Sequence, residues 1–192
     1  MTEPLQATAV APIELRRAAS RFATGVALVT APGGLALVID SFLSVSLQPP
    51  LIAFAPSRTS LTWRSMRLTG RFGVSILDAA HARDIRERAR PGADRLAGLD
   101  IDLLDGVPVV QNALAALVCA LEAEHFAGDH SIVLGRVLAI RHGDDRPPLV
   151  FFNGDFCTTH ASVSAVDPHF PPSRAESACS GRESPSASGR RL

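Results

Sequence analysis

The chain has 192 residues, of which 46% are hydrophobic and 20% charged, and its 19 basic residues balance its 19 acidic ones. This composition is typical of one globular domain, and the lack of a basic excess argues against nucleic-acid binding. No apolar run reaches the roughly 18 residues of a membrane span, and the first six residues lack the apolar stretch of a signal peptide. We therefore expect a cytoplasmic protein with neither a membrane nor a nucleic acid as its partner.

The cysteines Cys119, Cys157 and Cys179 are odd in number and widely spaced. This arrangement matches neither a disulfide framework nor a C-x-x-C metal or redox motif. We expect three reduced thiols and no metal site.

Composition divides the chain into three segments. Residues 1–11 are expected to be a flexible leader, residues 12–160 the folded domain, and residues 161–192 a disordered tail. The tail is rich in Ser, Pro, Gly and Arg. A segment with so few apolar residues cannot offset the entropy that ordering would cost it.

Short strands and two helices are predicted in the first half of the domain. Apolar residues recur at helical spacing after Pro12, and the Pro-Gly-Gly turn at 32–34 predicts a hairpin. In chain order the predicted elements are a helix from Pro12 to Phe22, strands over 25–31, 35–39, 42–47 and 51–55, and a helix over 60–68 closed by Gly70.

Strands also dominate the second half. The predicted elements are a strand over 72–77, a helix over 79–90, a segment over 113–126 that propensity leaves open between helix and strand, and strands over 130–140 and 149–152. Because the strands do not alternate regularly with helices, a doubly wound sheet is disfavoured. The pattern predicts a mainly β fold with a few helices, arranged as an antiparallel barrel.

The stretch from Ser57 to Thr62 lies between a predicted strand and a predicted helix, where a phosphate can bind. Ser60 can cap the helix, and the hydroxyls of Ser60 and Thr62 can donate to phosphate oxygens. Arg58 can add a charge-assisted hydrogen bond. An ordinary serine N-cap is the alternative interpretation.

Two further stretches carry candidate chemistry. The hydroxyls of Ser41, Ser44 and Ser46 are spaced so that they can line one face of a strand and hydrogen-bond a polar heterocycle. The alternative is the solvent face of an edge strand. His130 follows a Gly-Asp turn, where it can donate a proton or contact a ligand, and a surface turn with an incidental histidine is the alternative.

Together, these segments resemble the flavin reductase family. The motifs that carry the resemblance occur in the family's order across about residues 12–156. They are Leu15-Arg-Arg17 with Arg21-Phe-Ala-Thr-Gly-Val26, Asp40-Ser-Phe-Leu-Ser-Val-Ser-Leu-Gln-Pro-Pro-Leu51, Ser60-Leu-Thr62, Gly70-Arg-Phe-Gly-Val-Ser-Ile-Leu77, Ala127-Gly-Asp-His-Ser-Ile-Val-Leu-Gly135 and Pro147-Pro-Leu-Val-Phe-Phe152. The resemblance implies the FMN-binding split-barrel fold, with 113–126 as a strand.

The resemblance also implies an NAD(P)H:flavin oxidoreductase that transfers hydride from NADH or NADPH to FMN or FAD. Such proteins are typically homodimers, and many supply reduced flavin to a partner monooxygenase. The chemistry belongs to the cofactors, so the absence of a catalytic triad does not argue against an enzyme. The residues matched to the flavin and nicotinamide site are His130, as the catalytic residue, and Asp40, Ser41, Phe42, Ser44, Ser46, Arg58, Ser60, Thr62 and Ser75, as cofactor-binding residues.

Residues 36–40 depart from the family pattern. Leu37, Val38 and Ile39 replace small residues and a threonine, and Asp40 replaces an amide or hydroxyl. An ionised carboxylate offers no donor and repels a phosphate. This departure leaves open a non-catalytic split-barrel protein that binds flavin or another ligand, and an oxidase-type split barrel is a third reading.

Overall fold

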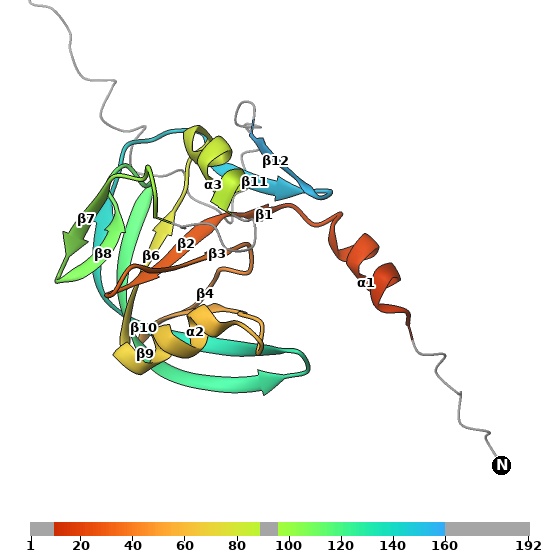
Figure 1. Ribbon diagram of the computed structural model, residues 1–192, viewed down its shortest axis with the longest axis horizontal. Coiled ribbons are helices and arrows are strands. Elements are labelled where there is room, and N and C mark those ends of the chain that lie inside the picture. The colour runs from red at the N-terminus through yellow and green to blue at the C-terminus, as the bar shows by residue number, and fades with distance from the viewer. Residues whose placement is uncertain (1–9, 89–95, 160–192) are drawn as a thin grey trace, which may run out of the picture. The chain divides into compact units, whose positions relative to one another are not determined.

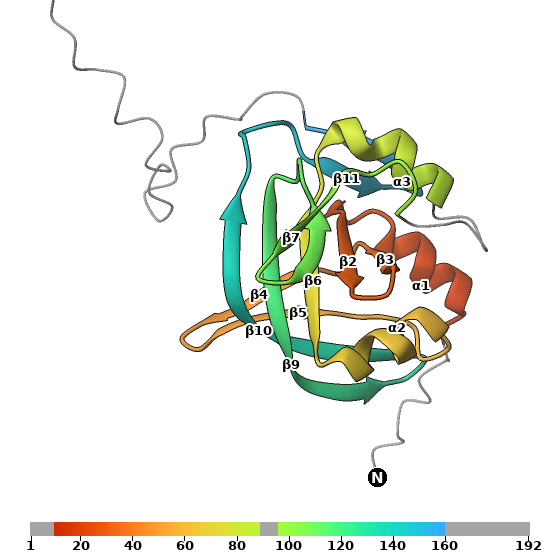
Figure 2. The ribbon, with the colours of Figure 1, turned by 60° about the vertical axis from the view of Figure 1, so that its left-hand side comes forward.

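The computed structural model describes residues 10–88 and 96–159, and its frame is a seven-stranded antiparallel sheet (Figures 1 and 2). In spatial order the strands of this sheet are β3 (Leu35–Ile39), β2 (Ala27–Ala31), β6 (Arg71–Ile76), β9 (Ala115–Ala127), β10 (His130–His142), β5 (Pro50–Phe54) and β4 (Leu43–Leu47). The strands β9 and β10 are long and curve strongly in both views.

Two small sheets and several helices complete the described structure. The sheets are β1–β11–β12 (Thr24–Gly25, Leu149–Phe152, Asp155–Thr158) and β7–β8 (Ile101–Leu104, Val107–Val110). The helices are α1 (Pro12–Ala19), α2 (Leu61–Met66) and α3 (Ala82–Arg88), with the short 3-10 turns η1 (Arg67–Thr69) and η2 (Ala79–His81). No helix within residues 10–88 and 96–159 is long and apolar enough to cross a membrane.

The main core contains three aromatic rings in edge-to-face contact. Phe54 of β5 lies 5.2 Å from Trp63 of α2 and 5.5 Å from Phe72 of β6, measured between ring centroids. All three side chains are buried, and such pairs contribute about 0.5–1.5 kcal/mol each beyond the apolar area that they bury. The aromatic contacts therefore attach α2 to the sheet.

The sequence prediction of a mainly β fold with a few helices is confirmed. The segment 113–126, which propensity left open, is the long strand β9, as the resemblance implied. The predicted strand 25–31 is in fact divided at Val26, because β1 pairs with β11 whereas β2 pairs with β3 and β6. The backbone of Val26 bonds instead to Leu149 and Leu77, on either side of it.

Two hairpins were missed by the sequence prediction. Asp105 and Gly106 join β7 to β8, and Asn153 and Gly154 join β11 to β12, all with positive φ. Asp-Gly and Asn-Gly pairs are preferred in two-residue hairpin turns that need positive φ at both positions. The signal was therefore present, although the flanking strands have only four residues each.

The expected tail, 161–192, lies outside the described residues, as do residues 1–9 of the expected leader. Those expectations and the boundaries of the folded domain stay predictions.

Candidate functional site

The loop that follows β5 contacts two other motifs that the sequence singled out. The amide of Ala55 donates a 3.0 Å hydrogen bond to Oγ of Ser41. Ser57 forms an isolated antiparallel bridge with His130, and the amide of Arg58 donates to the carbonyl of Asp129 at 3.0 Å. The fold thus gathers the start of the 41–46 stretch, the 57–62 stretch and the turn before His130 at one end of β5.

Ser60 is the N-cap of α2, because its Oγ accepts a 3.2 Å hydrogen bond from the amide of Trp63. That bond uses a lone pair and leaves the hydroxyl proton available to a ligand. Thr62 lies two residues further, in the first turn of α2, and is half-buried. Two hydroxyls at the start of one helix can therefore donate to the same anion.

Arg58 extends from this loop across the β9–β10 turn. Its Nη1 donates a 3.1 Å hydrogen bond to the carbonyl of Gly128, and its Cζ lies 4.8 Å from the ring centroid of Phe126. A wide surface pocket lies beside it, lined by Ser57, Arg58, Thr59 and Asp129. The guanidinium is thus held at the β9–β10 turn, and Arg58 lines this pocket together with Ser57 and Thr59.

His130 is the first residue of β10, directly after the two-residue turn Gly128–Asp129. Gly128 has φ +62°, which the first position of this kind of turn requires and which glycine adopts without strain. The Nδ1 of His130 lies 2.8 Å from Oδ1 of Asp129, and this hydrogen bond lowers the pKa of the Asp129 carboxyl. With Nδ1 engaged, Nε2 of this half-exposed ring is the nitrogen left for a ligand.

The 40–46 stretch is less regular than the sequence predicted. A β-bulge between Ser44 and Ser46 places them opposite Ile52 and Leu51, which are consecutive residues of β5. Consecutive strand residues point to opposite faces, so Ser44 and Ser46 do not share the face that their spacing had predicted. Ser41 precedes the strand, and its hydroxyl accepts the hydrogen bond from Ala55.

The remaining predicted cofactor residues differ in exposure. Asp40 is exposed directly after β3, and Phe42 is partly buried against the main core. Ser75 lies in the middle of β6, fully buried, and its Oγ accepts a 2.9 Å hydrogen bond from the amide of Val110. The structure therefore does not bring Ser75 to the group around Ser60 and His130.

Sequence reasoning missed the contacts that hold α2 in place. The indole Nε1 of Trp63 donates to Oε1 of Glu124 at 3.0 Å, and Nη1 of Arg67 lies 3.1 Å from Oε2 of the same carboxylate. Burial alone would raise the pKa of Glu124, but hydrogen bonds from Trp63, Ser131 and Arg67 outweigh burial and lower it. Glu124 is separated from these helix residues by more than fifty positions, so no local pattern could have revealed the contact.

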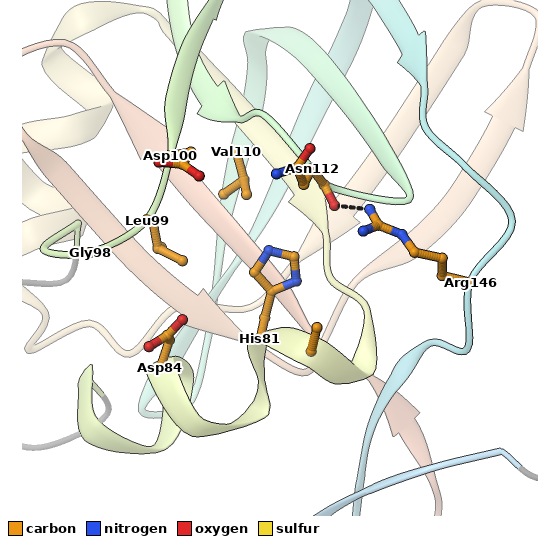
Figure 3. Close-up of a pocket in the computed structure, with 9 residues that line it drawn as sticks. His81, Asp84, Gly98, Leu99, Asp100, Val110, Asn112 and Arg146 are labelled. Atoms are coloured by element: carbon orange, nitrogen blue, oxygen red, sulfur yellow. Dashed lines mark hydrogen bonds between the residues drawn. The ribbon is translucent and has the colours of Figure 1, made fainter.

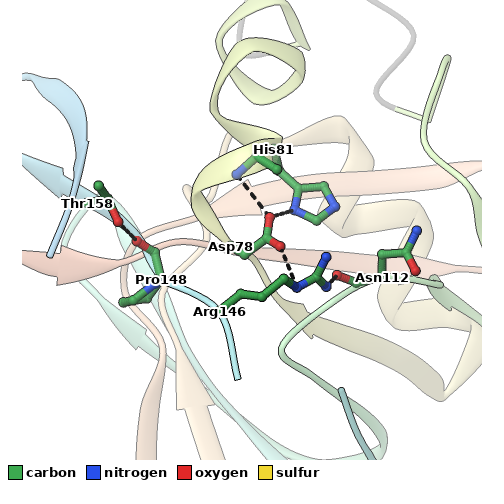
Figure 4. A network of polar contacts seen from close by, with 7 residues as sticks. Asp78, His81, Asn112, Arg146, Pro148 and Thr158 are labelled. Carbon is green, nitrogen blue, oxygen red and sulfur yellow. Dashed lines mark hydrogen bonds and ion pairs between the residues drawn. The ribbon is translucent and has the colours of Figure 1, made fainter. Parts of the chain in front are cut away.

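A second polar cluster surrounds Asp78, whose side chain is 2% exposed (Figure 4). Its Oδ1 lies 2.6 Å from Nδ1 of His81, and its Oδ2 lies 3.0 Å from Nε of Arg146. Neither contact is a well-directed hydrogen bond, and the attraction between Asp78 and Arg146 is that of an ion pair. Asp78 also accepts a hydrogen bond from the amide of Ala80 at 3.0 Å, which caps the turn η2.

Beside this cluster is a small pocket of about 190 Å³ (Figure 3). The imidazole of His81 projects into it between Asp84, Asp100 and Asn112. Among residues 10–88 and 96–159 no group of three or more His, Cys, Asp or Glu side chains is arranged to hold a metal ion. The polar groups that line the pocket are carboxylates, an imidazole, an amide and a guanidinium, in contrast to the hydroxyl-rich loop that carries Ser60.

Comparison with known proteins connects these features to a family. Residues 19–160 match the model of the family described as "Flavin reductase like domain". The chain is 32% identical over 156 residues to the reductase subunit HsaB of a flavin-dependent monooxygenase from Rhodococcus jostii, covering 78% of this chain and 79% of that protein. It is 35% identical over 153 residues to an NADH-dependent flavin reductase from a Rhodococcus species, covering 77% of this chain and 86% of that protein.

A solved structure shows the same architecture. The NADH:FAD oxidoreductase of Streptomyces globisporus superimposes with a TM-score of 0.72 at 31% sequence identity, covering 81% of this chain and 99% of that one.

Proposed function

This chain belongs to the family of flavin reductase like domains, and on that premise we propose that it transfers a hydride from NADH or NADPH to a flavin, FMN or FAD. The likeness to a solved oxidoreductase also confirms the split-barrel fold expected from the sequence. When both cofactors are bound, the nicotinamide supplies the hydride and the flavin ring accepts it. The protein therefore has to bind the two cofactors, orient their rings and exclude water from them.

The observation that carries this proposal is the approach of the Ser57 loop to the turn at His130. The bridge between Ser57 and His130 brings the loop with Ser60 and Thr62 close to the only histidine of the predicted site. We infer that the hydroxyls of Ser60 and Thr62 donate to a phosphate and that Arg58, held at the neighbouring turn, supplies the positive charge. These residues fit a flavin mononucleotide whose phosphate lies at the loop.

The residues of the proposed site divide into groups with different roles. Ser60, Thr62 and Arg58 would hold the phosphate, while Ser41, Phe42 and one of Ser44 and Ser46, which lie on opposite faces of β4, would border the flavin ring. His130, held at Nδ1 by Asp129, presents Nε2 to the reacting rings and can exchange a proton there. We assign no contact with the flavin to Ser75, because its buried hydroxyl bonds to the amide of Val110.

The activity test is direct. Purified protein mixed with NADH or NADPH and with FMN, FAD or riboflavin is expected to lose the absorbance of the reduced nicotinamide. An unchanged nicotinamide absorbance with every pair of substrates would refute the proposal.

The second candidate, a flavin-binding protein without reductase activity, is favoured by the exposed carboxylate of Asp40. Tight FMN binding without nicotinamide oxidation would establish that candidate instead.

The proposal includes a homodimer. Leu43, Val45 and Leu47 of the edge strand β4 are 60%, 47% and 85% exposed, and Leu138 and Ile140 of β10 are also exposed. Such apolar side chains along an unpaired edge are usually covered by a partner. Light scattering coupled to gel filtration is expected to report twice the chain mass, whereas a monomer would contradict the dimer.

The proposal extends to a flavin-dependent oxygenase as the consumer of reduced flavin, because one relative is the reductase subunit of a monooxygenase. We also propose a cytoplasmic location, which cell fractionation tests. The transfer of reduced flavin to an oxygenase is tested by mixing a flavin-dependent oxygenase with NADH, flavin and this chain as the sole reductase. Formation of the oxygenated product is the expected result.

A further inference from the structure

Next to the proposed phosphate loop lies a pocket that shares only Arg58 with the residues assigned a role above. Its volume is about 180 Å³, which is smaller than the roughly 300–1,000 Å³ of sites that enclose a whole ligand. It is therefore suited to one part of a larger molecule. The side chains that matter for its chemistry are Arg58, Arg64, Arg67, Glu124, Phe126 and Ser131.

The pocket carries an excess of positive charge. Its single carboxylate, Glu124, already accepts from Trp63 and pairs with Arg67. Arg64 is exposed, one turn after Ser60, and has no acidic partner in the described part of the chain. Arg58 uses Nη1 for the carbonyl of Gly128, and its other donors remain. Two guanidinium groups are thus left for an anion.

An aromatic ring lies beside this charge. Phe126, near the end of β9, is 71% exposed. The guanidinium of Arg58 stacks on the ring at 4.8 Å, but a side chain so exposed cannot be covered on both faces by one group. The uncovered part of the ring can stack against a planar heterocycle, as aromatic side chains do with nucleobases.

An anion site adjoining a stacking surface matches the chemistry of a nucleotide. We propose that Phe126, Arg58 and Arg64 form the subsite for the adenosine diphosphate moiety that FAD and the nicotinamide dinucleotides share. The adenine stacks on Phe126, and the arginines bind the diphosphate. This assignment rests on the proposed flavin site, since Arg58 belongs to the loop that carries Ser60.

The first experiment measures binding of ADP alone to the full chain by calorimetry. Wild type is expected to bind ADP, and Phe126→Ala and Arg64→Gln are each expected to weaken that binding about fivefold or more, since stacking of one base contributes roughly 1–3 kcal/mol. The matched control is Phe152→Ala, a change at another exposed phenylalanine (41% exposed) on β11. It is expected to leave ADP binding unchanged.

The second experiment identifies which dinucleotide uses the subsite. If FAD uses it, Phe126→Ala raises the dissociation constant of FAD about fivefold and leaves that of FMN unchanged. If the nicotinamide dinucleotide uses it, Phe126→Ala raises KM for NADH about fivefold when FMN is the acceptor. Either result supports the subsite. No change in either would overturn it, and so would an equal loss of FMN and FAD binding.

The two proposals fail in different ways. Wild type that oxidises NADH with FMN but does not bind ADP refutes the subsite and leaves the reductase assignment intact. Wild type that binds ADP but oxidises no nicotinamide refutes the reductase assignment and supports the subsite.

Discussion

The indole Nε1 of Trp63 donates a 3.0 Å hydrogen bond to Oε1 of Glu124, and this contact fixes the helix α2 to the strand β9. Trp63 is also the residue whose amide donates to the N-cap Ser60. One residue therefore connects the aromatic core, the strand that leads to the His130 turn and the loop proposed to bind phosphate. The position of that loop depends on a tertiary contact.

Replacing Glu124 with alanine is expected to lower the free energy of unfolding by about 1–3 kcal/mol. The change leaves the buried indole N–H of Trp63 without an acceptor and Arg67 without its carboxylate. Urea unfolding measures the loss. The matched control is Glu122→Ala on the same strand, because Glu122 makes an exposed pair with Arg136 and its removal is expected to cost much less. Equal losses in the two variants would contradict the importance of the Trp63 contact.

The stabilisation by Glu124 is expected to depend on pH. The pKa of Glu124 is lowered in the folded protein from an ordinary value of 4.5, so its contribution is fully present above pH 4.5 and is lost as pH falls through the folded pKa. The difference in unfolding free energy between wild type and Glu124→Gln should therefore shrink on acidification below pH 4.5. A difference that stays constant or grows would show that the carboxylate is not the stabilising form.

The double variant Ser60→Ala, Thr62→Ala is expected to weaken FMN binding tenfold or more and to leave riboflavin binding nearly unchanged. Only FMN carries the phosphate to which the hydroxyls donate, and a hydrogen bond to a charged group contributes about 1.5–3 kcal/mol. Fluorescence titration with each flavin measures both constants.

Riboflavin also controls for the lost helix cap, which is expected to cost roughly 1 kcal/mol of stability by itself. Ser60→Thr with Thr62→Ser keeps both hydroxyls and should restore FMN binding. Equal losses for the two flavins would refute the phosphate assignment.

Asp78→Ala is expected to lower the free energy of unfolding by about 2–3 kcal/mol, because it leaves Arg146 without the buried carboxylate and removes the cap of η2. The loss lies below the largest values for buried ion pairs, since the side chain of Arg146 is 36% exposed and water can solvate it. Chemical denaturation tests this. Asp155→Ala, which removes an exposed partner of Arg86, serves as the comparison and is expected to lose less.

Cys157 is expected to react with iodoacetamide in the native protein, whereas Cys119 is not. Cys119 is buried in the main core, and burial raises the pKa of its thiol to about 12, so almost no thiolate is present near neutral pH. Cys157 is exposed on β12. Peptide mass spectrometry of labelled protein reads out both sites. Labelling of Cys119 before unfolding would contradict the buried position.

Local patterns in the sequence predicted most of the strands and helices of the fold. Apolar alternation and turn residues located most strands of the main sheet, and Ser60 was identified as a helix cap from its position alone. The Asp-Gly and Asn-Gly hairpins show that local chemistry held further information that the prediction did not use. These features can be predicted because they depend on residues only a few positions apart.

The sequence by itself determined which chemical groups the candidate site contains, namely the hydroxyls of Ser60 and Thr62, the guanidinium of Arg58 and the imidazole of His130. Only the tertiary structure decided which of them meet. In the folded chain Ser57 pairs with His130, whereas Ser75 is buried and accepts a hydrogen bond from Val110. A bulge places Ser44 and Ser46 on opposite faces of their strand. Such outcomes depend on strand pairing between residues far apart in the chain, and a shift of one residue in that pairing turns a side chain to the opposite face.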